Sequence, residues 1–209
     1  MPVLKVSIFL LALVPLARLL VLGFTGGLSA NPIEFITRST GTWTLVLLLA
    51  TLSVTPLRIL TGWSSLAALR RMLGLFSFFY ASLHLTTFVW FEHWFDVPAM
   101  LQDVIKRPFV TVGMIAFVLM TPLALTSTNT MMRRLGRRWQ TLHRLVYAIA
   151  VLGVLHFWWV RGGKNDFADP TVYALVAALL LGFRVVQYLR RRRARARLQP
   201  GGGRRRSSA

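Results

Sequence analysis

Six long apolar stretches decide what this chain can fold into. An α-helix needs about 20 mainly apolar residues to cross the hydrocarbon core of a bilayer. Such stretches occur at residues 6–24, 43–60, 73–95, 108–126, 143–160 and 170–189. Backbone N–H and C=O groups must find their partners within each segment in lipid. The expected fold class is therefore all-α, a polytopic membrane protein built as a bundle of six transmembrane helices.

The composition agrees with a membrane protein and excludes several other classes. Of the 209 residues, 55% are hydrophobic, and the mean hydropathy is +0.58, which is too apolar for a soluble domain of this size. The net charge of +19 comes from basic residues at the ends of apolar stretches and in the C-terminal tail, a pattern that argues against nucleic-acid binding. With no cysteine in the chain, iron–sulfur clusters and thiol catalysis are excluded, and a redox role needs a bound cofactor.

The distribution of charge predicts the orientation. Arginines are concentrated between the second and third stretches, between the fourth and fifth, and in the tail, and loops of this kind face the cytoplasm. The alternate loops hold all six acids: Glu34, Glu92, Asp96, Asp103, Asp166 and Asp169. Both termini are therefore expected to be cytoplasmic. The first stretch also resembles a signal peptide, but it is long and interrupted by Pro15 and Arg18, which favours a retained helix.

One membrane domain is expected over residues 1–190, without an internal repeat. Residues 191–209 are expected to form a disordered, basic cytoplasmic tail, because the sequence after Leu198 has no periodic apolar face. Its arginines suit contact with anionic membrane lipid, although a solvated tail is the simpler interpretation.

Two of the apolar stretches contain histidines. His84 lies in the third stretch, and His143 and His156 lie in the fifth. Both stretches are expected to run from the inside to the outside. At a rise of 1.5 Å per residue, His84 lies roughly 21 Å above Arg70, and His156 lies roughly 20 Å above His143. His84 and His156 should then lie at one depth, where they could hold one haem iron between the third and fifth helices.

His143 is expected at the inner level with no histidine opposite, where the sequence offers Arg70 or Arg71. Thirteen residues turn an ideal helix by about 220°, so His143 and His156 do not share a face. Either the helix bends, for which Gly153 gives room, or the two histidines serve different neighbours.

A structural role is the alternative for these histidines, since an imidazole in an apolar helix can simply bond a neighbouring helix. Ionisable residues within the membrane are, however, rare and usually functional, and imidazole is the commonest metal ligand. Three histidines on two parallel spans favour a cofactor site. His93, beside Glu92 at the outer interface, is interpreted as a surface residue. The spans have no Asp or Glu at their centres, which argues against a proton-driven transporter.

Four segments resemble a known family in their order and spacing. They are TGTWTLVLLLATLSVTPLR, RRMLGLFSFFYASLHLTTFVWFE, KRPFVTVGMIAFVLMTPLALTST and RLGRRWQTLHRLVYAIAVLGVLHFWW. The chain is similar over about residues 30–190 to the MsrQ family, the haem-binding membrane subunits of bacterial MsrPQ systems, within the ferric-reductase-like transmembrane superfamily.

The resemblance implies a bacterial inner-membrane protein that binds haem b and, in family descriptions, FMN. It implies that electrons pass from quinol to a periplasmic, molybdopterin-containing methionine-sulfoxide reductase subunit, which repairs oxidised proteins. His84, His143 and His156 fall on the family's haem-associated histidines. NADPH-oxidase-like members of the superfamily carry two histidines on each helix and a nicotinamide domain. This chain has one buried histidine in the third stretch and lacks that domain, which leaves the inner ligation open.

These features together predict an electron-transfer subunit, with the sulfoxide chemistry on the partner chain. The outer loops 25–42, 96–107 and 161–169 are the expected docking surface. A ferric or cupric reductase that works without a protein partner is one alternative. A cofactor-free transporter or assembly factor is another.

Overall fold

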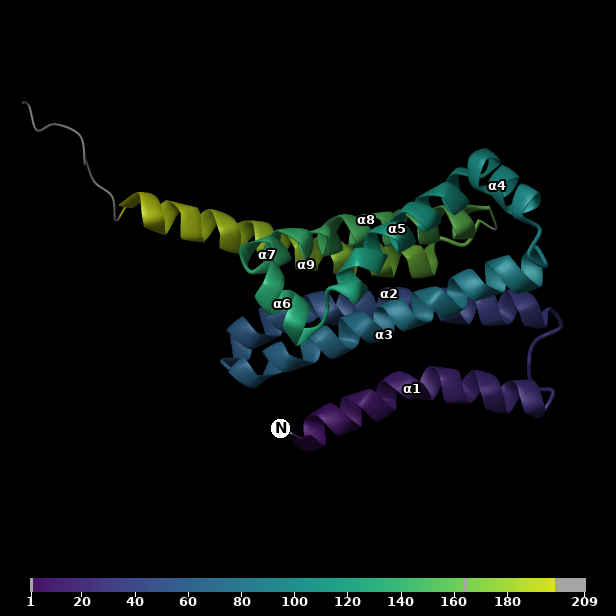
Figure 1. The fold of residues 1–209 in the computed structure, drawn as a ribbon, viewed down its shortest axis with the longest axis horizontal. Helices are drawn as coiled ribbons and strands as arrows, with labels where there is room; N and C mark the ends of the chain where they lie inside the picture. The colour runs from purple at the N-terminus through teal and green to yellow at the C-terminus, as the bar shows by residue number, and fades with distance from the viewer. Residues whose placement is uncertain (1, 164, 198–209) are drawn as a thin grey trace, which may run out of the picture.

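The computed structural model describes residues 2–163 and 165–197, and these residues form helices and connecting turns without a strand (Figure 1). Six helical segments in this part of the chain are long and apolar enough to cross a membrane, which confirms the expected fold class. In chain order the elements are α1 (Pro2–Phe24), α2 (Pro32–Thr61), the 3-10 turn η1 (Ser64–Leu66), α3 (Ala67–Thr86), the π-helical turn η2 (Thr87–Glu92), α4 (Val97–Lys106), α5 (Pro108–Leu125), α6 (Asn129–Leu135), α7 (Arg137–Leu142), α8 (Leu145–Gly162) and α9 (Ala168–Arg197).

The second span begins earlier than expected. Asn31 caps α2 by accepting a hydrogen bond from the backbone N–H of Glu34 at 3.2 Å, and Pro32 fits the first turn because its missing N–H has no partner there. Residues 32–42, expected as part of an outer loop, are therefore helical. At the other end Gly62 takes a left-handed conformation, with φ 73°, and closes the helix.

Short helices replace two of the expected loops. Asp96 caps α4 through a hydrogen bond from Ala99 N to its Oδ1 at 3.0 Å, so the expected loop 96–107 is largely helical. Trp94 and Phe95, just before it, have φ values of 47° and 64°, a region that non-glycine residues rarely adopt. Between the fourth and fifth spans lie α6 and α7.

The fifth span is not one continuous helix. α7 ends at Leu142 and α8 begins at Leu145, so His143 and Arg144 form the joint between them. The last span, in contrast, is longer than expected: α9 continues to Arg197, which is past the expected domain boundary at 190. The expected disorder after Leu198 falls outside the described residues.

Tyr80 fastens α1 to the bundle. Its side chain is 0% exposed, and its hydroxyl accepts a hydrogen bond from Leu16 N at 3.1 Å and donates one to Ala12 O at 2.8 Å. In an uninterrupted helix Leu16 N would donate to Ala12 O directly. The hydroxyl therefore inserts into the backbone ladder of α1, beside Pro15.

The spans are arranged as two antiparallel pairs with further helices beside them. Figure 1 shows α2 next to α3, and α5 near α8 and α9, with α1 along the side of the α2–α3 pair. α4 lies at one end of the bundle, and α6, α7, the N-terminus and the last part of α9 lie at the other. These ends are called the α4 end and the α6 end below. One core cluster joins α2, α3, α5, α8 and α9 around Leu52 and Ile149, each 1% exposed.

Candidate cofactor site

A cavity inside the bundle holds two of the three expected histidines. It lies between α2, α3, α5 and α8, and His84 and His156 are both on its wall. Much of the rest of the wall is apolar, including Leu45, Leu48, Ala81, Phe117, Met120 and Ile149. An apolar cavity with a few convergent polar groups is the usual form of a cofactor site, because burial holds the group and the polar residues orient it.

Helix α2 fixes His84. The Nδ1 atom of His84 lies 2.9 Å from the carbonyl oxygen of Thr37. Since a carbonyl only accepts hydrogen bonds, Nδ1 carries the proton, and Nε2 of the neutral ring keeps its lone pair. Gly41, one turn further along α2, lies against the ring: a Cβ there would come within 3.0 Å of His84 Cε1. α2 therefore sets both the tautomer and the position of this imidazole.

Helix α5 holds His156 in the same way. Its Nδ1 donates to Phe109 O at 2.7 Å, and a Cβ on Gly113 would come within 2.9 Å of the ring. Each histidine is 47 residues from its carbonyl partner. The pairs α2–α3 and α5–α8 thus hold their histidines through the same kind of contact.

The two imidazoles, which the spacing predicted to lie at one depth, are close together. Their ring centroids are 6.0 Å apart and their planes are inclined by 75°. Two imidazoles on opposite sides of one metal ion have centroids about 6 Å apart, given bonds of about 2.0 Å and a ring radius of about 1.1 Å. Two ligands are too few for a bare ion, and the described residues contain no group of three or more His, Cys, Asp or Glu side chains that could hold one. The two histidines would suit the iron of a haem, which is held by histidines in many haem proteins.

His143 is not part of this cavity wall. Its Nδ1 lies 3.0 Å from Trp139 O, on the preceding turn, and the Trp139 indole stacks on its ring at 3.8 Å between centroids. Ser127 Oγ lies 3.5 Å from Nε2, at the limit of a hydrogen bond. His143 lies at the joint between α7 and α8, whereas His156 lies within α8. The two histidines serve different neighbours, which was the second of the two geometric alternatives.

Arg70 lies near His143 and away from the cavity. It is half-buried on α3, close enough for its charge to act on His143. His93 differs from its interpretation as a surface residue. Its side chain is only 12% exposed, and its Nε2 lies 3.2 Å from Asp103 Oδ2. Asp103, which lies on α4, covers His93. The segment that forms α4 was expected to be a loop.

Sequence reasoning missed several residues of the site. Thr37 and Phe109 act through backbone carbonyls, which no residue pattern reveals. A lone glycine inside an apolar span is a recognisable sign of close approach, and Gly41 and Gly113 could have been noted on that ground. Three arginines also line the cavity near the α4 end: Arg38, Arg107 and Arg161.

Known proteins resemble this chain over most of its length. Residues 37–154 match the family model described as ferric reductase like transmembrane component. A protein of Herminiimonas arsenicoxydans named protein-methionine-sulfoxide reductase heme-binding subunit MsrQ is 60% identical over 182 residues, which cover 87% of this chain and 84% of that protein. Proteins of the same name from Polaromonas naphthalenivorans and Rhodospirillum rubrum are 50% and 47% identical, over 93% and 91% of this chain and 89% and 91% of theirs. No solved structure matches the chain.

Proposed function

This chain belongs to the MsrQ family, and on that premise we propose that it is a haem-binding membrane subunit that carries electrons to a methionine-sulfoxide reductase. The observation that carries the proposal is the pair His84 and His156, with ring centroids 6.0 Å apart on the wall of a buried cavity. Bound haem b would supply one-electron oxidation and reduction at its iron. The sulfoxide chemistry belongs to the partner chain.

Each part of the cavity has a task in this proposal. His84 and His156 offer Nε2 to the iron, because Nδ1 of each ring is tied to a carbonyl on α2 or α5. Such a hydrogen bond fixes the ring orientation and makes the imidazole a stronger ligand. The apolar side chains of the wall exclude water and hold the surroundings at low dielectric, which tunes the potential of a buried haem.

His143 and Arg70 are proposed as cofactor-associated residues at a second level. Their support is their proximity and the family resemblance. The proposal that the protein binds FMN rests on the resemblance alone. A flavin fluorescence measurement on the denatured protein tests this proposal. An FMN-free but haem-loaded preparation would remove FMN from the proposal.

The charge distribution supports an orientation for the protein in this proposal. Basic residues surround the α6 end and continue along α9, so we place that end and both termini in the cytoplasm of a bacterial cell, with the bundle in the inner membrane among its lipids. Quinol within the bilayer is the proposed electron donor. The α4 end then faces the periplasm, where a molybdopterin-containing methionine-sulfoxide reductase subunit would dock. That end lies nearest the facing histidines.

The acids at the α4 end test the docking surface. Electron transfer to the partner should slow after simultaneous substitution by asparagine at four positions: Asp96, Asp103, Asp166 and Asp169. Asp96 caps α4, Asp103 pairs with His93 and Arg107, and Asp166 and Asp169 pair with Arg161, so thermal unfolding and haem content are measured for the variant as well. Unaltered transfer in the fourfold variant would show that these acids do not contribute to docking.

The main test is the visible absorption spectrum of the purified protein, oxidised and reduced. The wild type should show the Soret band of haem. His84→Ala and His156→Ala should each abolish the same signal, whereas His143→Ala should change a different signal or a potential. A colourless wild type, as the cofactor-free transporter or assembly factor requires, would overturn the proposal, and full haem content in the first two variants would overturn the site.

A second candidate is a reductase of ferric or cupric ions outside the cell, favoured by the description of the matching family model. The purified, reduced protein with a ferric chelate separates the two. Rapid reduction of the chelate without a protein partner supports the second candidate, and reduction only of the partner supports the first.

A further inference from the structure

The cavity has a charged end that the histidines do not explain. Where α2 begins, α8 ends and α4 meets α5, its wall includes Arg38, Glu92, Arg107 and Arg161. Apart from the two histidines, these four are the ionisable residues of the described wall, so positive charge exceeds negative charge by two. A haem carries two propionate carboxylates, which need partners of opposite charge when they are buried.

Arg161 is the most enclosed of the three arginines. Its side chain is 20% exposed, with Nη1 at 2.6 Å from Asp166 Oδ2 and Nη2 at 2.9 Å from Asp169 Oδ2. Its guanidinium carbon also lies 5.6 Å from the centre of the Phe157 ring. Neither aspartate lines the cavity. The arginine thus lines the cavity while its two acidic partners lie outside the cavity wall.

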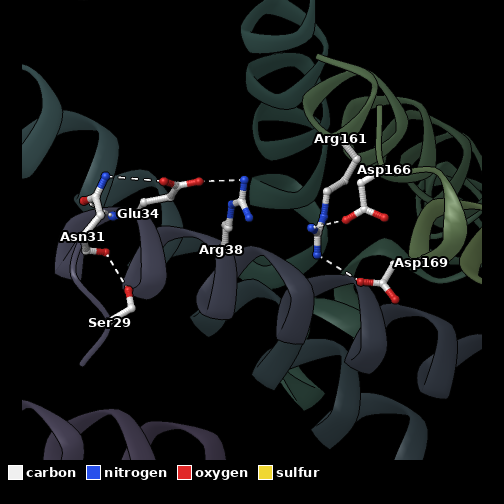
Figure 2. A network of polar contacts seen from close by, with 7 residues as sticks. All are labelled: Ser29, Asn31, Glu34, Arg38, Arg161, Asp166 and Asp169. Atoms are coloured by element: carbon white, nitrogen blue, oxygen red, sulfur yellow. Dashed lines mark hydrogen bonds and ion pairs between the residues drawn. The ribbon is translucent and has the colours of Figure 1, made fainter. Parts of the chain in front are cut away.

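Arg38 and Arg107 are also paired with acids. Arg38 Nη2 lies 2.6 Å from Glu34 Oε1, and Arg107 Nη1 lies 3.3 Å from Asp103 Oδ2. These acids also do not line the cavity. Figure 2 shows Arg38 beside Glu34, and Arg161 beside Asp166 and Asp169. A guanidinium has five N–H donors, so each arginine keeps donors for a second carboxylate.

Two more residues bear on what this end can bind. Thr37 lines the cavity, and its Oγ1 is buried without a hydrogen-bond partner in the structure, which leaves a donor for a polar ligand atom. Glu92 is the acid of the wall and repels a carboxylate. The three arginines of the wall outnumber it. The end as a whole suits an anion.

We propose that Arg38, Arg107 and Arg161 bind the haem propionates, so that the haem lies with its carboxylates toward the α4 end and its apolar edge toward the α6 end. This inference rests on the proposed function. It assigns three further cofactor-binding residues, and it directs the charged edge of the haem toward the end where the partner would dock.

The test combines arginine variants with a haem analogue. The wild type and Arg38→Gln, Arg107→Gln and Arg161→Gln are each prepared as apoprotein and loaded with haem or with its dimethyl ester, which lacks the two charges. Each arginine variant should hold haem roughly tenfold more weakly than the wild type, because a charge-assisted hydrogen bond is lost. The wild type should lose at least that factor with the ester, because the ester removes the charged partners of all three arginines. With the ester, each arginine variant should bind about as tightly as the wild type does, since the interaction that the substitution removes is already absent.

The midpoint potential provides a second readout. Removing a positive charge near the iron disfavours the reduced form, so each arginine variant should have a lower potential than the wild type. Asp166→Asn/Asp169→Asn breaks the ion pairs of Arg161 without removing its positive charge, and it should leave the potential unchanged or raise it. Lys106→Gln removes a neighbouring exposed charge that does not line the cavity and is the control for nonspecific effects.

The possible failures are separable. A wild type that takes up no haem overturns the proposed function and this assignment together. Haem uptake with equal retention of haem and its ester in the wild type overturns this assignment alone. Arginine variants that match Lys106→Gln in haem retention and midpoint potential also overturn this assignment alone. Arginine variants that lose flavin and keep haem do the same, because they would identify this end as a flavin phosphate site.

Discussion

The facing pair His84 and His156 and the surroundings of His143 use the same side chain in different ways. Each histidine of the pair donates from Nδ1 to a carbonyl 47 residues away, on another helix. His143 instead bonds a carbonyl four residues back, and the indole of that same residue covers its ring. A ring fixed by a distant helix is placed by the fold, whereas a locally fixed ring follows its own helix. Packing between helices therefore positions the two rings of the pair, whereas His143 lies opposite no second imidazole.

The largest expected effect is loss of the haem held by the pair. His84→Ala/His156→Ala should lose essentially all of that haem, and no more than either single variant, because two axial ligands of one iron act as a unit. Haem per protein, measured by extraction and absorption, checks this. If each single variant retains about half of the wild-type haem and the double variant none, the two histidines bind separate haems.

A smaller effect is expected from the glycines behind the pair. A Cβ at Gly113 or Gly41 would come within 2.9 Å or 3.0 Å of the imidazole, so Gly113→Ala and Gly41→Ala should displace the rings and lower haem content severalfold. Unfolding stability should not fall in parallel, because alanine favours a helix over glycine by about 1 kcal/mol.

Gly182→Ala is the matched control for the glycine variants, because a Cβ at Gly182 of α9 meets nothing within 4 Å. Haem content and thermal unfolding are measured for all three. Equal haem content in Gly113→Ala and Gly182→Ala would show that close approach of α5 to His156 is not required.

At His143 we expect an effect on stability more than on the pair. Trp139→Leu removes the stacked indole and its hydrogen bond from Nε1 to Thr126 O at 3.0 Å, which should cost about 1–3 kcal/mol. The Soret band of the facing pair should stay unchanged in position and intensity per folded protein. Trp63→Leu, at a largely exposed position, is the control. A shifted Soret band in Trp139→Leu would mean that the two regions are coupled.

The smallest effect is expected for Arg70→Gln. Because Arg70 acts on His143 and is absent from the cavity wall, this variant should alter only the signal that depends on His143, by a modest change in midpoint potential. Arg71→Gln is the neighbouring control, since Arg71 Nη1 donates instead to Asn129 Oδ1 at 2.5 Å. A loss of haem from the facing pair in Arg70→Gln would contradict the separation of the two regions.

Only part of the candidate site could be predicted from the sequence. The common depth of His84 and His156 was predictable, because rise per residue and span direction fix the depth of a side chain. The break at His143 was not, because the residues around it are as apolar and as arginine-rich as those of an ordinary span end. Residues 32–42 were expected as a loop, since Glu34 and Arg38 lower the local hydropathy. Glu34 and Arg38 instead form an ion pair at 2.6 Å within the first turns of α2.

The sequence by itself determined the number and order of the spans and the level of the two central histidines, because lipid requires each backbone segment to satisfy its own hydrogen bonds and a helix has a fixed rise. The tertiary structure decided which carbonyl orients each imidazole, which glycine admits the ring and which arginines share one cavity. Those contacts join segments far apart in the chain, and only the packing of whole helices sets which faces meet.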